Sequence, residues 1–178
     1  MVKRILILVC LMAAAMPLLR AQEIPTEERA GELQIGLGYS KASPDYSPHT
    51  FSGETLYADY DFRDHWGIEG DFHDVKEPSS DNEGIYEKTY EIGPRYLWHI
   101  SRFDPYVKIL IGRGVFNYPF NSANLAYNMY SFGGGVDIRV KPYLNVRLID
   151  VELQKWGSFP PNGLSPKVYT FGVAYRFH

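Results

Sequence analysis

Apolar and polar residues alternate one by one over long stretches of this chain, and this period constrains the fold more than any other feature. The C-terminal segment VYTFGVAYRFH places Tyr169, Phe171, Val173, Tyr175 and Phe177 on one face and small or polar residues on the other. A period of two is typical of a β-strand whose two faces meet different surroundings. Beyond the N-terminal segment, no stretch carries an apolar stripe with helical spacing. The sequence therefore predicts an all-β fold.

Eight segments follow this alternation. They are expected at residues 32–41, 54–63, 66–74, 85–98, 105–116, 128–140, 143–155 and 168–178. Short connections (DH, HISRFD and KP) alternate along the chain with long ones (ASPDYSPHTFSG, VKEPSSDNEG, NYPFNSANLAY and WGSFPPNGLSP). Short periplasmic turns and long extracellular loops alternate in this way in outer-membrane barrels. We therefore predict an eight-stranded antiparallel up-and-down transmembrane β-barrel over residues 32–178.

The first 21 residues have the organisation of a cleaved secretory signal peptide. Two basic residues precede the apolar run ILILVCLMAAAMPLL, which is too short for a spanning helix, and Ala21 ends an acceptable cleavage site. Residues 22–31 are expected to form a flexible lead. Cys10 is the only cysteine and lies inside the predicted signal, which excludes disulfides and cysteine-based catalytic or metal sites from the mature chain.

The net charge argues against a nucleic-acid partner. The formal charge is −3 at pH 7, and it becomes −6 once Lys3, Arg4 and Arg20 leave with the signal. A nucleic-acid-binding domain is normally basic. The composition, with 14 Tyr, 10 Phe and 16 Gly, suits strands and turns.

The alternation alone does not decide which face of the strands points inward, since a soluble barrel or sandwich would bury the apolar face. The predicted export signal, the connection lengths and the aromatic residues near strand ends favour a membrane barrel whose apolar face meets lipid. The aromatic residues expected in the two interfacial girdles are Tyr39, Tyr60, Phe62, Trp66, Tyr96, Trp98, Tyr130, Tyr175 and Phe177.

Charges that point into an eight-stranded barrel must be paired, because a lone buried charge is very costly and the lumen only accommodates side chains. We therefore predict a salt-bridge network that fills the lumen. Its members are Asp59, Asp61, Glu69, Asp71, Glu91, Arg95, Lys108, Asp137, Arg139 and Arg147. Arg95 is expected to pair with Glu91 or with a carboxylate on the third or fifth strand.

Two positions depart from the simple pattern. Arg113 falls on the outward face of the fifth strand, where it either reaches lipid phosphates near the interface or marks a bulge at a flanking glycine. In the seventh strand the apolar residues change parity. This change predicts a bulge near residues 149–150 that turns both Arg147 and Asp150 inward.

The segments YEIGPRYLWHISRFDPYVKILIGRG, SFGGGVDIRV, VRLIDVELQ and YTFGVAYRF together resemble small outer-membrane barrels of the OmpA/OmpX type. More closely, they resemble the broad outer membrane protein beta-barrel domain family, over residues 31–178. The resemblance implies insertion by the outer-membrane assembly machinery, which reads a C-terminal strand with alternating aromatic residues. The residues that match this signal are Tyr169, Phe171, Tyr175 and Phe177, although His178 follows the final aromatic residue.

No segment carries a strong catalytic or metal motif. The HIS segment at residues 99–101 is superficially similar to the His-x-Ser of outer-membrane lipid A deacylases, but it falls in a predicted periplasmic turn. In DFHD, at residues 71–74, strand alternation splits the two acids between the faces. The acidic SSDNEG segment lacks EF-hand spacing. We therefore expect no enzymatic activity, no metal and no cofactor.

The leading functional hypothesis is a structural or surface-interaction barrel of the outer membrane. It is expected to be monomeric and to contact outer-membrane lipids, including lipopolysaccharide. The alternatives are a narrow channel for ions or small solutes, a lipid-modifying enzyme and a soluble lipocalin-like binder. The long loops contain no recognisable ligand motif.

Overall fold

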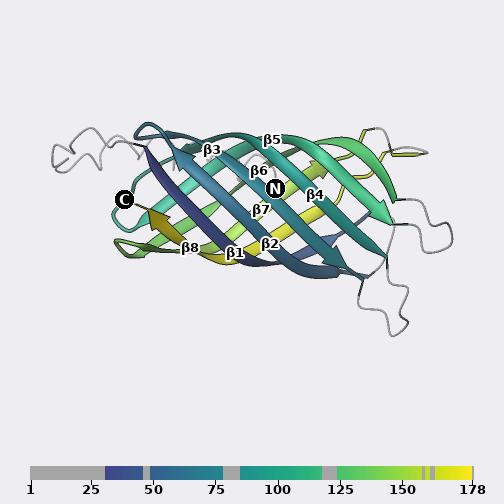
Figure 1. Cartoon of the computed structure of the whole chain (residues 1–178), viewed down its shortest axis with the longest axis horizontal. Helices are drawn as coiled ribbons and strands as arrows, with labels where there is room; N and C mark the ends of the chain where they lie inside the picture. The colour runs from purple at the N-terminus through teal and green to yellow at the C-terminus, as the bar shows by residue number, and fades with distance from the viewer. Residues whose placement is uncertain are drawn as a thin grey trace, which may run out of the picture.

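The computed structural model describes residues 31–45, 49–77, 85–117, 124–157, 159–160 and 163–177. In these residues all regular secondary structure is β (Figure 1). The strands are β1 (Glu32–Ser43), β2 (Phe51–Asp61), β3 (Trp66–Lys76), β4 (Tyr86–Leu97), β5 (Phe103–Asn117), β6 (Asn124–Lys141), β7 (Leu144–Lys155) and β8 (Lys167–Phe177). The described residues include no helix that is long and apolar enough to cross a membrane. The predicted signal peptide and nearly all of the predicted lead lie outside the described residues.

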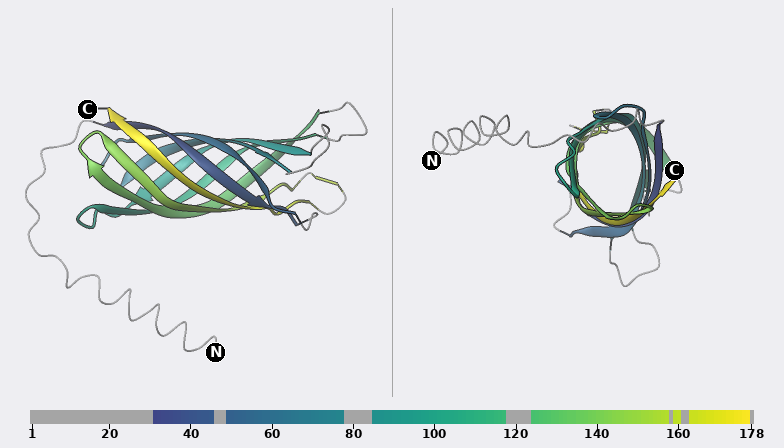
Figure 2. Two further views of the ribbon diagram at one scale, coloured as in Figure 1. Left: turned by 90° about the horizontal axis from the view of Figure 1, so that it is seen from below. Right: turned by 90° about the vertical axis from the view of Figure 1, so that its left-hand side faces the viewer.

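The eight strands close into one antiparallel barrel. Each strand pairs with its neighbours in sequence, and β1 pairs with β8 from Leu33–Phe177 to Ser43–Lys167. Seen end-on, the strands form a complete ring (Figure 2). A closed ring leaves no strand edge with unpaired backbone groups. The predicted eight-stranded up-and-down barrel is therefore confirmed.

The two ends of the barrel differ in the length of their connections. Residues 62–65, 98–102 and 142–143 make the three short connections. The C-terminal Phe177 lies at the same end, because it pairs with Leu33 at the start of β1 (Figure 1). We call this the short-turn end and the opposite end the long-loop end.

Several strands are longer than the sequence predicts, mainly toward the long-loop end. β2 begins at Phe51 rather than at residue 54, and β6 begins at Asn124 rather than at residue 128. The extension of β6 has the sequence NLAY, in which apolar and polar residues do not alternate. It is held by the ladder to β5, which continues to the pair Asn117–Asn124.

The apolar face of the strands is the outer one. Leu37, Ile92, Ile111 and Phe132 are all more than half exposed on this face, while the opposite face buries most of the charged side chains. Aromatic residues cluster at the short-turn end, where Tyr96 lies between Trp66 and Trp98 at ring-centroid distances of 5.0 and 4.9 Å. An apolar outer band with aromatic residues at its borders is the arrangement of a transmembrane barrel.

The predicted bulge in β7 is confirmed. The ladder between β7 and β8 shifts register between Arg147 and Asp150, and the two intervening residues both face outward. Arg147 and Asp150 are therefore both buried in the lumen. One extra residue on a strand has this effect, because it reverses the parity of everything that follows.

A bulge beside Arg113 is not observed. β5 pairs without interruption with β4 and β6 from Gly112 to Gly114, and Arg113 faces Tyr90 on one side and Asn128 on the other. Its side chain is exposed on the outer face. The bulge is therefore wrong, and Arg113 faces outward on a regular strand, while its contact with lipid phosphates stays a prediction.

Candidate functional site

The lumen of the barrel is the candidate site, because most of the buried ionisable groups lie there. Its long-loop end is closed by apolar side chains, which we call the long-loop plug. The plug residues are Ala42, Phe51, Val75, Phe116, Met129, Trp156, Leu164 and Val168, in two clusters that both contact Ile85. None of the eight is more than 4% exposed. The sequence analysis missed this plug, although several of its members share the inward parity of the charged residues.

Glycine makes room for the largest plug residue. A Cβ atom on Gly114 would lie 2.3 Å from the ring of Trp156, so the indole occupies the space that a side chain would need. Trp156 is fully buried, and its Nε1 donates a hydrogen bond to Gln154 Oε1 at 3.3 Å. The plug is therefore joined to the polar layer beneath it.

A small polar layer lies below the plug. Ser40 is hydrogen-bonded to Thr55 and to Thr170, the latter at 2.5 Å between hydroxyl oxygens. His73 Nδ1 lies 2.8 Å from Thr55 Oγ1, and its Nε2 lies 3.5 Å from Glu152 Oε1. These residues connect four strands, β1, β2, β3 and β8, with Glu152 on β7.

The next layer is built around one ammonium group. Lys108 Nζ lies 2.8 Å from Glu69 Oε1, 2.7 Å from Asp71 Oδ2, 2.9 Å from Asp150 Oδ2 and 2.6 Å from Glu152 Oε1. All five side chains are buried. One cation from β5 is thus shared by two carboxylates of β3 and two of β7.

Three members of this region have metal-ligand chemistry. The donor atoms of Asp71, His73 and Glu152 lie within 4.8 Å of one another, and mixed oxygen and nitrogen donors suit zinc and similar ions. However, the Lys108 ammonium lies within 2.7 Å of both carboxylates and already supplies the positive charge. Asp74 faces outward and pairs with Lys88 at 3.0 Å, so alternation does split the two acids of DFHD. We therefore describe this cluster as part of the ion-pair network.

Two guanidinium groups form the lower part of the network, and they share three carboxylates. Arg95 contacts Asp59 (2.6 Å), Glu69 (3.2 Å) and Asp137 (3.5 Å). Arg147 contacts the same three acids at 3.1, 2.8 and 3.1 Å. The five groups come from five different strands, so they bridge the lumen from side to side.

Tyrosine rings cover these two arginines. The guanidinium carbon of Arg147 lies 3.8 Å from the centroid of Tyr57, and that of Arg95 lies 4.6 Å from the centroid of Tyr106. The Tyr106 hydroxyl donates a hydrogen bond to Asp150. Cation–π contact in a desolvated site adds to the attraction between the charges.

The ten residues predicted for the network occupy two environments. Asp59, Glu69, Asp71, Glu91, Arg95, Lys108, Asp137 and Arg147 are buried inside the barrel. Asp61 and Arg139 are half-buried at the short-turn end, where Arg139 Nε lies 2.9 Å from Asp104 Oδ2. The structure thus brings eight of the ten together in the lumen. Of the two at the mouth, Asp61 still contacts the network, with its Oδ1 3.7 Å from Arg95 Nε.

The expected pairing of Arg95 is correct for the third strand and wrong for Glu91. Glu69 on β3 is a partner, whereas Glu91 accepts hydrogen bonds from Ser131 Oγ (2.6 Å) and Gln154 Nε2 (2.8 Å) instead. Residues four apart on one strand are separated by about 13 Å. Glu91 therefore lies in the upper layer and Arg95 in the lower one.

Glu152 and Gln154 are members of the network that the sequence analysis did not include. Both lie on β7 after the bulge, where the parity of the inward residues is reversed. The predicted bulge was the signal that could have identified them. Counting from Asp150 in steps of two leads to both residues.

Acids outnumber bases among the buried groups. The buried carboxylic residues are Asp59, Glu69, Asp71, Glu87, Glu91, Asp104, Asp137, Asp150 and Glu152, and the buried bases are Arg95, Lys108, Arg147 and Arg176. Arg95, Lys108 and Arg147 each contact three or more of these acids. Removal of a base should be more harmful than removal of an acid.

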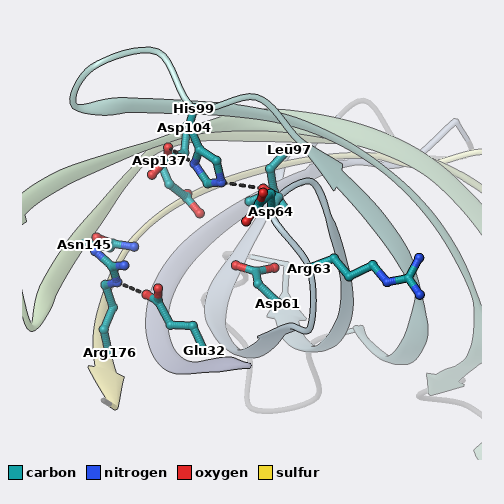
Figure 3. Close-up of a pocket in the computed structure, with 10 residues that line it drawn as sticks. All are labelled: Glu32, Asp61, Arg63, Asp64, Leu97, His99, Asp104, Asp137, Asn145 and Arg176. Atoms are coloured by element: carbon teal, nitrogen blue, oxygen red, sulfur yellow. Dashed lines mark hydrogen bonds and ion pairs between the residues drawn. The ribbon is translucent and has the colours of Figure 1, made fainter. Parts of the chain in front are cut away.

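The short-turn end forms a polar mouth (Figure 3). Arg176 pairs with Glu32 there, and the mouth encloses a cavity of about 30 Å³. That volume has room for about two water molecules. The cavity therefore offers no space for a larger ligand.

His99 at this mouth is engaged on both ring nitrogens (Figure 3). Its Nε2 donates to the Asp64 carbonyl at 2.5 Å, and its Nδ1 lies 2.7 Å from Asp104 Oδ1. Ser101 lies in the turn with a φ of 58°, and its carbonyl accepts a hydrogen bond from Arg139 at 2.5 Å. A catalytic histidine would direct one nitrogen at the serine hydroxyl. The contacts of the HIS segment are instead those of a turn.

A steric test of the lumen packing is available at Gly36. A Cβ atom there would lie 2.1 Å from the ring of Tyr57, which stacks on Arg147. We expect Gly36→Ala to lower the free energy of unfolding by about 1–3 kcal/mol, because the ring must move off the guanidinium. Urea unfolding in detergent, followed by tryptophan fluorescence, measures the change. Gly70→Ala is the control, since its Cβ would meet nothing closer than 3.8 Å. Equal midpoints for the two variants would contradict the packing described here.

Comparison with known proteins finds one matching family, which covers most of the chain. The family described as "Outer membrane protein beta-barrel domain" matches residues 6–177. No curated protein matches the chain by sequence.

Solved structures share the fold at low sequence identity. Neisserial surface protein A (NspA) is 12% identical with a TM-score of 0.66, over 85% of this chain and 100% of that one. OprG from Pseudomonas aeruginosa is 15% identical with a TM-score of 0.59, over 85% and 98%. Ail, the attachment invasion locus protein of Yersinia pestis, in complex with the heparin analogue sucrose octasulfate, is 19% identical with a TM-score of 0.54, over 84% and 100%. At such identities the likeness shows the fold alone.

Proposed function

Because this chain belongs to the outer membrane protein beta-barrel domain family, we propose that it is a closed, non-conducting barrel with a structural and surface-interaction role. The long-loop end faces the outside and the short-turn end faces the periplasm, as in other outer-membrane barrels. A role at the surface then depends on the outer wall and the long loops rather than on transport through the lumen.

The observation that carries this proposal is that the lumen is blocked at two levels. The long-loop plug closes the outer end with buried apolar side chains. Below it, Lys108, Arg95 and Arg147 bind carboxylates from opposite walls at 2.6–3.5 Å. An ion would have to displace both layers. Eight strands leave an interior that side chains can fill, which agrees with such a closure.

The names of two similar proteins support a role in surface contact. NspA is named as a surface protein, and Ail as an attachment invasion locus protein whose structure holds a heparin analogue. The present chain shares the fold of both proteins, and its own long connections lie at one end of the barrel. Its long loops are the surface that a partner outside the cell would meet first.

The chain is proposed to assemble as a monomer through its last strand. The barrel is closed by β1 and β8, so no strand edge remains for a second copy, and native mass spectrometry of the detergent-solubilised protein tests this. Tyr169, Phe171, Tyr175 and Phe177 all face outward on β8 and would be read by the insertion machinery. Phe177→Ser should then reduce the folded fraction in cells more than Phe132→Ser, an equally outward change on β6. Equal losses would contradict the assembly role.

The same proposal assigns no catalytic activity to the chain. The contacts of His99 with Asp64 and Asp104 support this, because neither nitrogen is directed at Ser101. Incubation of the folded protein with purified lipopolysaccharide, followed by mass spectrometry of the lipid, tests it. Released fatty acid that is lost in His99→Ala would overturn this part of the proposal.

Planar-bilayer recording tests the closed lumen directly. The unmodified protein should show no steady conductance. A variant without the plug aromatics (Phe51→Ala with Trp156→Ala) and a variant without one network base (Arg147→Ala) should each stay closed, since one layer remains. Conductance is expected only when the two changes are combined. Steady conductance of the unmodified protein would favour the alternative function, a narrow channel.

A further inference from the structure

The apolar outer wall has a hollow over strands β2 to β5. Ala58 on β2 and Gly70 on β3 are register partners that both face outward, and Ile92 continues the same row on β4. Leu56 and Phe72 lie in the next row toward the long-loop end. Together with neighbouring wall residues they line a groove of about 530 Å³. Small residues in the middle of otherwise bulky rows create this groove.

Neither packing nor backbone geometry requires a glycine at position 70. A Cβ atom on Gly70 would meet nothing within 3.8 Å, whereas every other glycine of the eight strands would place its Cβ within 2.8 Å of another atom. The backbone at Gly70 does not have a positive φ. Glycine inside a strand weakens it and often marks a close approach by a ligand. The missing side chain therefore has one structural consequence, which is the space in the groove.

A cation lies at the end of the groove that is nearer the long loops. Arg113 faces outward in the row of Leu56, Phe72 and Tyr90, one row above Gly70. No described residue forms a hydrogen bond or ion pair with its guanidinium, whereas the outward-facing Lys88 pairs with Asp74 at 3.0 Å. An unpaired charge on the lipid face is costly at mid-membrane and tolerated near the interface. Tyr90, the register partner of Arg113 on β4, is an aromatic residue of the kind that is enriched at membrane interfaces.

We propose that this groove binds one acyl chain of a phosphorylated glycolipid of the outer leaflet, with a lipid phosphate on Arg113. The proposal rests on the orientation given under the proposed function, in which the long loops face outside. The planar guanidinium can donate two parallel hydrogen bonds to a phosphate. The acyl chain then runs from Arg113 toward the membrane centre, over Gly70 and Ala58. In a membrane this contact is stabilised by close packing rather than by removal from water.

The expected ligand is a phosphate monoester of a glycolipid such as lipid A rather than a common phospholipid. A phosphate monoester carries more negative charge than a phosphodiester. Lys88 lies on the neighbouring strand but is already paired with Asp74 at 3.0 Å, so Arg113 is the base that remains for the phosphate. A zwitterionic phospholipid would instead bring its own ammonium group close to this guanidinium.

Native mass spectrometry of the folded full-length protein tests the proposal. The protein is released from detergent after incubation with diphosphoryl lipid A, dephosphorylated lipid A or phosphatidylglycerol. We expect one tightly held copy of diphosphoryl lipid A, and at least about tenfold weaker binding of the other two lipids. Equal binding of phosphatidylglycerol would overturn the glycolipid assignment, and equal binding of dephosphorylated lipid A would overturn the phosphate contact.

Two variants separate the two halves of the site. Arg113→Gln removes the charge, and Gly70→Leu fills the groove without a steric clash at Cβ. Each should lower lipid A binding by about tenfold, since each removes one of the two contacts. The matched controls lie on the opposite wall: Lys41→Gln removes an outward base of β1, and Val173→Phe adds bulk on β8. Loss of lipid A binding in Arg113→Gln but not in Gly70→Leu would contradict the binding of the acyl chain in the groove.

The outcomes are independent of those for the closed lumen. A conducting protein that still loses lipid A in both variants would contradict the proposed function and retain the lipid site. A protein that does not conduct and binds lipid A equally in all variants would agree with the proposed function and contradict the lipid site. A gel-shift measurement on unboiled samples confirms that each variant is folded before its lipid is counted.

Discussion

Lys108→Met is expected to lower the free energy of unfolding by about 3–5 kcal/mol, because it leaves several buried carboxylates without their cation. The ammonium lies within 2.9 Å of carboxylate oxygens of Glu69, Asp71, Asp150 and Glu152. No other described base lies as close to Asp71, Asp150 or Glu152. Domains of this size are stable by only about 5–15 kcal/mol. Much of the variant should therefore fail to refold from urea into detergent, as measured by the folded band on an unboiled gel.

Neutral partners should restore the fold if uncompensated charge is the cause. The triple variant Lys108→Met with Asp71→Asn and Glu152→Gln removes two of the stranded charges and keeps their shape. Its urea midpoint should return most of the way to that of the parent. Lys88→Met is the control, since it removes a lysine with a single carboxylate partner, Asp74 on the outer face, and should lower the urea midpoint less than Lys108→Met. A Lys108→Met barrel as stable as the control would show that the ammonium is not the centre of the network.

The fold could be predicted from sequence because the two faces of a barrel strand have different surroundings. Apolar and polar residues therefore alternate along the strand. The alternation around Tyr169–Phe177 places every second side chain against lipid, and the same holds for the other strands. Even the irregularity of β7 was readable, because Leu148 and Ile149 are adjacent apolar residues that cannot both follow one parity. Such local signals need no knowledge of the rest of the chain.

The partners inside the lumen could not be predicted in the same way. Contacts between Arg95 and Asp137, or between Lys108 and Glu152, cross the barrel between strands that are not neighbours. They depend on the stagger of all eight strands, which sets the level of each side chain along the barrel axis. Sequence parity gives the face of a residue but not its level. The choice of Glu91 for Arg95 failed for this reason.

The long-loop plug could not be predicted for the same reason, since parity does not give the position of a residue along the barrel axis. Phe51 and Trp156 have the parity of inward residues, but so do Tyr57 and Tyr106, which lie among the charges. The level of Phe51 and Trp156 near the long loops is what makes an apolar layer possible there. Gly114 provides the space for the indole, and this pairing is visible only once β5 and β7 are placed.

Arg147→Lys is expected to be nearly as destabilising as Arg147→Met, at about 3 kcal/mol or more. Arg147 uses three nitrogens for three acids: Nε for Asp137, Nη1 for Glu69 and Nη2 for Asp59, at 3.1, 2.8 and 3.1 Å. A single ammonium on a flexible stem keeps the charge but cannot reach three separate carboxylates in this plane. It also loses the stacking of the guanidinium on Tyr57. Urea midpoints of the two variants in the same detergent give the comparison.

A double-mutant cycle of Arg147 and Asp59 then measures how strongly the charges of these two residues are coupled. Asp59→Asn alone should destabilise the barrel, because Arg95 and Arg147 both contact this carboxylate, at 2.6 and 3.1 Å. In the Arg147→Met background the same change should raise stability, since one acid fewer then depends on Arg95 alone. Residues that share one network show coupling energies of about 0.5–3 kcal/mol. Asp74→Asn, on the outer face, should give no such reversal. If Asp59→Asn destabilised both backgrounds equally, the three carboxylates and two guanidinium groups would not act as one charge network.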